Sequence, residues 1–212
     1  LNAADDKLTE AKEAYYKAVA TLQYVTLTTA RRAFNSAQLG KFDAAKSDIA
    51  VLNASGFKSD PYVNFVSGYI DFKRANYPAA TLAFEQSVAA NPDNTLAKLY
   101  LASSYIQEGR LEQARLVTNQ LLSTIPNSVD IARLLASLNI KQRDYSAAKD
   151  TLTVLLETNE DDTVALGMLG GIALLQGNGD EAVEYLERLE KLSPEYYSVK
   201  RMLELAKTMR GD

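Results

Sequence analysis

The sequence predicts an all-α fold made of antiparallel helix pairs that repeat every 34 residues. Four alanines mark the period, because they follow one another at intervals of 34 residues: Ala80, Ala114, Ala148 and Ala182. A Gly or Ala stands twelve residues before each of these alanines, and a proline stands twelve residues after three of them: Pro92, Pro126 and Pro194. A fixed period of this length is typical of a helical repeat array.

Each marker has a physical role within one helix pair. The small residue on the first helix and the alanine on the second allow two antiparallel helices to approach closely. The proline ends the second helix, because proline lacks a backbone N–H and disfavours helical geometry in the residue before it. One pair buries little apolar surface, so the stability of the array comes from stacking on its neighbours.

The register divides the whole chain into successive elements. Residues 1–25 are expected to form the second helix of a partial repeat, because Ala11 and Tyr15 occupy the offsets of such a helix. A less regular repeat around Ala45 follows at 26–60. Four regular repeats and a terminal helix complete the series: 61–94, 95–128, 129–162, 163–196 and 197–212. No linker or low-complexity stretch interrupts the run, which indicates one continuous domain.

Both ends are expected to lie inside a longer array. Residues 1–25 have no first helix before them, and Gly211-Asp212 falls where Gly109-Arg110 falls in its own repeat. The alternative is a natural N-terminal helix together with a natural capping helix. The charged face of the last helix would suit such a cap, because it carries Lys200, Arg201, Glu204 and Lys207.

Composition excludes more functions than the motifs indicate. The 212 residues carry a net charge of −4 with a pI near 5.1, whereas a nucleic-acid-binding protein needs a basic surface to contact phosphates. The chain has no Cys and no His, which removes disulfides, thiol nucleophiles, Ser-His-Asp triads and structural zinc. No apolar run approaches the roughly 20 residues that span a bilayer. We therefore expect a protein without catalysis or cofactor, and a segment that does not itself insert into a membrane.

A carboxylate cluster is the one remaining route to chemistry. Glu157, Glu160, Asp161 and Asp162 crowd one loop, and their oxygens could serve a cation such as calcium. However, the loop lacks the glycine and the alternating ligands of a calcium-binding loop. A solvated turn is the better interpretation, with Asp161 or Asp162 near the N-terminus of the next helix, where negative charge is favourable.

The repeat resembles the tetratricopeptide repeat (TPR) family, whose pattern has a small residue at its eighth position, alanine at the twentieth and proline near the thirty-second. Gly68, Ala80 and Pro92 hold these positions in the second complete repeat. The resemblance implies a right-handed superhelical solenoid that acts as a protein-interaction scaffold. The Ala-rich second helices further resemble bacterial arrays of envelope and exopolysaccharide systems, which favours the periplasm or cell envelope over the cytoplasm.

The first helices of TPR arrays line a concave groove, so the resemblance implies a partner-binding surface there. Four aromatic residues lie on one helix face at spacings of 3, 4 and 3 residues: Tyr62, Phe65, Tyr69 and Phe72. They would offer rigid apolar contact area to a partner helix or extended peptide, or alternatively pack into the core. Other repeats contribute Phe34, Leu99, Ser103, Gln107, Arg133 and Lys141. The last two would meet an acidic group of the partner or, alternatively, stay solvated.

We therefore expect a non-catalytic scaffold that binds a protein or peptide partner in its concave groove. Two alternatives stay open. One is a cytoplasmic assembly or regulatory adaptor with the same fold, and the other is the positioning array of a larger enzyme whose catalytic domain lies outside this chain. Exposed apolar faces at the ends of the array would also permit weak self-association.

Overall fold

The computed structural model describes residues 2–195 and 197–211, with side chains from residue 10 onward, and contains helices and no strand within these ranges. The predicted all-α class is therefore confirmed. The chain divides into two compact units, Leu1–Ser104 and Tyr105–Asp212. None of the helices in the described ranges has both the length and the apolar composition needed to cross a membrane.

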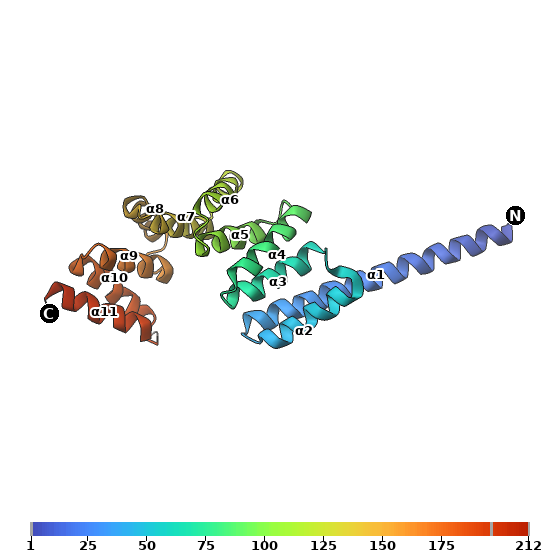
Figure 1. Ribbon diagram of the computed structural model, residues 1–212, viewed down its shortest axis with the longest axis horizontal. Helices are drawn as coiled ribbons and strands as arrows, with labels where there is room; N and C mark the ends of the chain where they lie inside the picture. The colour runs from blue at the N-terminus through green and yellow to red at the C-terminus, as the bar shows by residue number, and fades with distance from the viewer. Residues whose placement is uncertain (1, 196, 212) are drawn as a thin grey trace. The chain divides into compact units, whose positions relative to one another are not determined.

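The first unit is a stack of helices in which neighbours along the chain pack together (Figure 1). In chain order its elements are α1 (Asn2–Gln38), α2 (Phe42–Leu52), the π-helical turn η1 (Asn53–Phe57), α3 (Pro61–Lys73), α4 (Tyr77–Ala90) and most of α5 (Thr95–Gln107). α1 packs on α2 and α3, while α3 also packs on α2 and α4. Helix α3 is therefore enclosed by several neighbours.

The second unit repeats the same arrangement. Its helices are α6 (Leu111–Thr124), α7 (Val129–Lys141), α8 (Tyr145–Thr158), α9 (Thr163–Leu175), α10 (Gly179–Leu192) and α11 (Tyr197–Arg210). Each helix packs on the next one, and α9 additionally contacts α7 and α11. Contacts between alternate helices are what a stack of helix pairs produces, because the first helices of successive pairs form one layer.

Helix α1 differs from the prediction that one helix would end near residue 25 and another would begin at residue 26. It is a single helix of 37 residues from Asn2 to Gln38. The chain has no Gly or Pro before Gly40, so no residue in this stretch is a strong helix breaker. The N-terminal half of α1 consequently extends beyond the helices that pack on it (Figure 1).

A left-handed residue follows each of the alternate helices α1, α3, α5, α7, α9 and α11. Its φ is 74° at Gly40, 59° at Ala75, 75° at Gly109, 63° at Arg143, 76° at Gly177 and 95° at Gly211. These positions are 34 or 35 residues apart, so the period of the sequence is also the period of the backbone. Ala75 and Arg143 adopt a conformation that costs a residue with a side chain roughly 1–2 kcal/mol.

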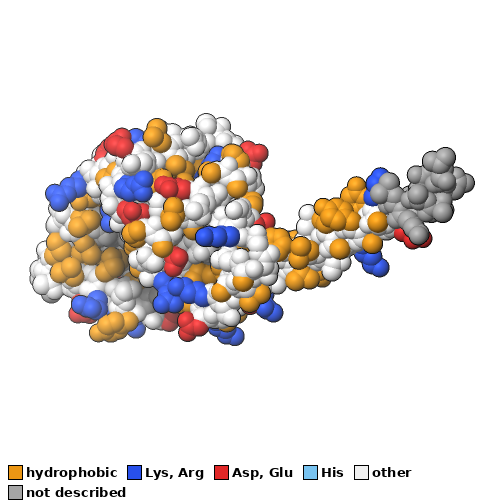
Figure 2. All heavy atoms as spheres, turned by 45° about the vertical axis from the view of Figure 1, so that its right-hand side comes forward, with side chains coloured by type: hydrophobic (Ala, Val, Ile, Leu, Met, Phe, Trp, Pro, Cys, Tyr) orange, Lys and Arg blue, Asp and Glu red, His pale blue; other side chains and the backbone are white. Residues whose placement is uncertain are grey.

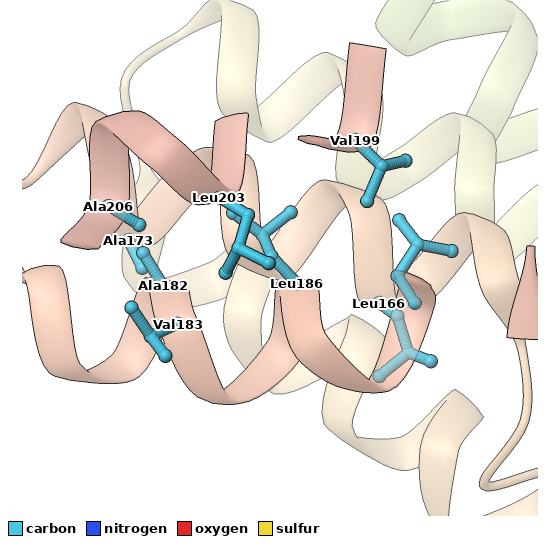
Figure 3. Packing of buried hydrophobic residues seen from close by; sticks show 9 residues of the cluster. Leu166, Ala173, Ala182, Val183, Leu186, Val199, Leu203 and Ala206 are labelled. Carbon is cyan, nitrogen blue, oxygen red and sulfur yellow. The ribbon is translucent and has the colours of Figure 1, made fainter. Parts of the chain in front are cut away.

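Small residues set the distance between paired helices. A Cβ atom added at Gly68 of α3 would lie 2.7 Å from Phe84 Cε1 of α4, and one added at Gly170 of α9 would lie 2.8 Å from Leu186 Cδ2 of α10. Each glycine thus lets a large side chain of the paired helix sit directly on its backbone. Figure 3 shows the resulting core of the second unit, where apolar side chains of α9, α10 and α11 meet: Leu166, Ala173, Ala182, Val183, Leu186, Val199, Leu203 and Ala206.

Candidate functional site

Helix α3 is the central element of the predicted binding surface. Its N-terminus is capped by Asp60, whose carboxylate accepts hydrogen bonds from the backbone N–H groups of Tyr62 and Val63, both at 2.9 Å. Pro61 occupies the start of the helix, where its missing N–H costs nothing. The hydroxyl of Ser87 in α4 donates to the carbonyl oxygen of Pro61 at 2.7 Å. These contacts fix how α3 presents its aromatic side chains.

Rings from four helices of the first unit form one aromatic cluster. Its members are Phe34 of α1, the four aromatic residues of α3 named above, Phe84 of α4 and Tyr100 of α5. Ring centroids lie 4.8 Å apart for Phe34 and Tyr69, 5.2 Å for Tyr69 and Tyr100, and 5.4 Å for Phe72 and Tyr100. Such tilted and edge-to-face pairs are favourable beyond the area that they bury.

The four rings of α3 do not share one environment. Phe65 and Tyr69 are only 2% and 5% exposed, so for these two rings the alternative of core packing holds. Val63, Val66 and Ile70 on the other side of the helix are buried as well, so the inward position of the rings needs no rotation of α3: the helix is covered on both sides.

The outer part of the cluster is half-buried. Phe34, Tyr62 and Phe72 each keep part of the ring in solvent, and we call these three residues the aromatic rim. The rim spans α1 and α3, and its rings rest on the buried Phe65 and Tyr69 or on Tyr100. It is the part of the predicted surface that a partner could touch.

A pocket of about 250 Å³ opens beside the rim, between α1 and the start of α3. It is lined by Gln23, Thr26, Leu27, Ala30, Phe57, Asp60 and Tyr62. Burial raises the pKa of Tyr62, while the positive charge of Arg31 acts in the opposite direction. The Tyr62 hydroxyl therefore stays protonated at neutral pH and can donate a hydrogen bond.

The predicted residues of α5 lie at the other side of the cluster. Leu99 and Ser103 are half-buried, and the Ser103 hydroxyl donates to the Leu99 carbonyl oxygen at 2.8 Å, while Gln107 is exposed. Sequence reasoning did not select Tyr100, whose ring lies next to four others. Its position was the available signal, since Tyr100 stands 34 residues after the buried Val66 and so occupies a core register.

Arg133, the predicted cationic residue of the second unit, is engaged within the chain. Its Nη2 atom lies 2.7 Å from Oδ2 of the buried Asp162, and its Nη1 atom lies 3.5 Å from Oδ1 of Asp130. The same Asp162 carboxylate accepts hydrogen bonds from the backbone N–H groups of Val164 and Ala165 at 3.1 and 2.9 Å. The pair thus joins α7 to the start of α9. Lys141 is exposed at the end of α7.

The carboxylate loop before α9 is a capped turn. Asp162 stands at the N-terminus of α9, as expected, whereas Glu157, Glu160 and Asp161 are exposed. Arg188 of α10 donates to the Glu160 carbonyl oxygen at 2.7 Å and so supports the loop from the other side. Among the residues that the structure describes, no three His, Cys, Asp or Glu side chains are grouped so that they could hold a metal ion.

Two sequence comparisons place this chain among known proteins. A family model described as "Tetratricopeptide repeat" matches residues 72–138 and 139–203, which together make up more than half of the chain. The cellulose synthase operon protein C of Pseudomonas fluorescens (strain SBW25) is 28% identical over 136 residues, covering 59% of this chain and 11% of that protein. The chain therefore spans only a small part of the length of this curated relative.

Several solved structures share the fold. A thermophilic TPR protein of Thermus thermophilus has a TM-score of 0.73 at 18% identity, over 86% of this chain and 99% of that one. PilW, a widely conserved type IV pilus biogenesis factor, has a TM-score of 0.70 at 14% identity, over 88% and 91%. YrrB, a TPR protein with an unusual peptide-binding site, has a TM-score of 0.61 at 14% identity, over 93% and 98%. At these identities the likeness is one of fold.

Proposed function

Because the chain belongs to the tetratricopeptide repeat family, we propose that it is a non-catalytic scaffold that binds a protein partner through the aromatic rim of its first unit. The observation that carries this proposal is the arrangement of the rings. Phe34, Tyr62 and Phe72 expose ring edges, while buried rings behind them hold them in place. A partner that covers such a surface orders few additional side chains, so little of its binding energy is lost to conformational entropy.

The pocket beside the rim defines the chemistry of the partner. Its walls include Leu27, Ala30 and Phe57, which suit an apolar side chain, and the Tyr62 hydroxyl can hydrogen-bond a backbone group of the same segment. Arg31 is exposed and close enough to influence the pKa of Tyr62. We therefore expect a helix or extended peptide that places an apolar anchor in the pocket and an acidic residue near Arg31.

The curated relative suggests the biological setting. Its name refers to a cellulose synthase operon, and the matched part is one section of that longer protein. We propose that this chain likewise serves a bacterial envelope or exopolysaccharide assembly system and works in the periplasm or cell envelope. A cytoplasmic adaptor and the positioning array of a larger enzyme are the alternatives, and the compartment of the partner distinguishes the first of them.

Partner capture with three matched forms of the chain tests the proposal. Wild type, Arg31→Glu and Leu82→Glu would each be incubated with envelope and cytosolic extracts. Arg31 borders the rim, whereas Leu82 is an exposed residue of α4 outside it, so neither change removes a buried contact. We expect Arg31→Glu to lower recovery of a specific envelope protein by about tenfold through charge repulsion, while Leu82→Glu leaves recovery unchanged.

A second variant separates binding from folding. Phe72→Ser removes one ring of the rim, and its melting temperature would be compared with that of the wild type. Equal recovery of the partner by wild type, Arg31→Glu and a folded Phe72→Ser chain would show that the rim is not the binding surface. Recovery from the cytosolic extract alone would favour the adaptor alternative.

A further inference from the structure

The N-terminal half of α1 carries an apolar stripe that no other helix of the described chain covers. Tyr15, Leu22 and Val25 are 66%, 52% and 51% exposed, and Ala11 and Ala18 are exposed as well. These five residues follow one another at spacings of 4, 3, 4 and 3, which places them along one line of the helix, as in a coiled-coil seam. We call them the arm seam. Figure 2 shows the apolar side chains along this part of the molecule.

The arm seam continues the face by which α1 packs in the first unit. Further along the same helix Thr26, Ala30, Ala33 and Ala37 are buried, and α1 packs there on α2 and α3. Leu22 precedes Thr26 by four residues and so lies one turn earlier on the same face. The covered interface therefore passes without interruption into an uncovered one.

A shallow groove runs along the seam. It is lined by Ala14, Lys17, Ala18, Thr21, Leu22 and Val25. The small side chains of Ala14, Ala18 and Thr21 leave room for the knobs of a second helix between the larger residues. The surface thus has the shape that receives a helix, and not that of a helix evenly covered with solvated side chains.

We propose that a second copy of this chain covers the arm seam by antiparallel pairing of two α1 helices. One register matches large side chains with small ones across the pair. It sets Tyr15 opposite Ala18 of the second copy and Leu22 opposite Ala11 of the second copy, and by symmetry the same pairs recur in the reverse direction. Alternation of large and small residues across a helix interface fills space without strain.

Charge favours the same register. Each charged residue at 10–13 stands level with an uncharged one of the second copy: Glu10 with Gln23, Lys12 with Thr21 and Glu13 with Ala20. A parallel pair in register would bring Lys12 level with Lys12, crowd Tyr15 against Tyr15 and leave a gap between two Ala18 side chains. The antiparallel arrangement avoids all three.

The proposed interface is small. The paired segments from Glu10 to Val25 are about 24 Å long, at a rise of 1.5 Å per residue. An interface of this length lies at the low end of the range for specific association, so a dissociation constant in the micromolar range is expected. The dimer would be populated at high concentration and would dissociate on dilution.

Sedimentation equilibrium from low to several hundred micromolar protein is the first test. Wild type should change from monomer to dimer over this range, whereas Leu22→Glu should raise the dissociation constant by about tenfold or more, because it places a charge in the seam. Leu82→Glu is the matched control, since Leu82 is 58% exposed on α4, and it should behave as wild type. Both leucines are exposed, so both variants should keep the wild-type melting temperature.

Cysteine crosslinking tests the register, and the chain has no Cys that could interfere. The register sets residue 11 of one copy opposite residue 22 of the other, so Ala11→Cys and Leu22→Cys chains should form a disulfide when mixed and oxidised. Either variant alone should not, because its two cysteines would be about 16 Å apart along the helix axis. A disulfide formed by Leu22→Cys alone would show a parallel pair and overturn the proposal. A chain that stays monomeric at every concentration would also overturn it, and would leave the seam to a helix of another polypeptide.

Discussion

Replacing Arg133 with Met should weaken the attachment of α9 to α7. Arg133 Nη2 lies 2.7 Å from Asp162 Oδ2, and Asp162 is only 4% exposed. A hydrogen bond to a charged group contributes about 1.5–3 kcal/mol. Because the Arg133 side chain is itself 32% exposed, solvent screening should reduce its loss to about 1 kcal/mol. Asp162→Ala also removes the two hydrogen bonds that cap α9 and should cost about 2–3 kcal/mol.

The pH dependence of this loss identifies the ion pair. Burial by itself would raise the pKa of Asp162, but the Ala165 N–H group and Arg133 together lower the pKa below its usual value. A carboxyl group with a lowered pKa stabilises the fold above its pKa in the unfolded chain, about 3.9, and the stabilisation is lost as the pH falls through its pKa in the fold.

Urea unfolding of wild type and Arg133→Met at neutral pH and near pH 2 is the assay. The difference between their free energies of unfolding should be largest at neutral pH and should shrink at the lower pH. Arg133→Ala serves as a check that the loss follows the charge and not the packing of the Met side chain. Equal stability of wild type and Arg133→Met at neutral pH would refute the reasoning, and so would a difference that does not change with pH.

Three further predictions concern the repeat geometry. Gly170→Ala should destabilise the wild type by up to about 2 kcal/mol, because its Cβ would lie 2.8 Å from Leu186, and should be neutral or stabilising in a Leu186→Ala chain; equal effects in both backgrounds on thermal unfolding would contradict the close approach. Arg143→Gly should raise the free energy of unfolding by about 0.5–1 kcal/mol, since it relieves a φ of 63°, and a destabilised variant would contradict this. Ala148→Trp should cost on the order of 1–3 kcal/mol or more by overpacking α7 against α8, and an unchanged melting temperature would speak against the repeat register.

The regular repeats could be predicted because every helix pair needs the same residue type at the same place. Gly68 and Gly170 recur at the eighth position since a large side chain of the paired helix rests on each of them. The irregular N-terminal part was harder. Extending the register placed a break near residue 25, but no helix-breaking residue stands before Gly40 and α1 continues to Gln38.

The surface was less predictable than the fold because it depends on partners distant in the sequence. Whether Phe65 faces a groove or the core is decided by Phe34 and Tyr100, which lie 31 and 35 residues away. Arg133 likewise finds its carboxylate 29 residues away, on the next first helix. Helical periodicity identifies which residues share a face, but it does not show what another helix places against that face.

Photocrosslinking from the aromatic rim in living cells is the most direct test of the proposed function. A photoreactive phenylalanine analogue would replace Phe72 in one form of the chain and, as a control, the exposed Leu82 of α4 in another. The proposed scaffold predicts one discrete crosslinked partner from position 72 and none from position 82. A partner that crosslinks equally from both positions, or from position 82 alone, would contradict recognition through the rim.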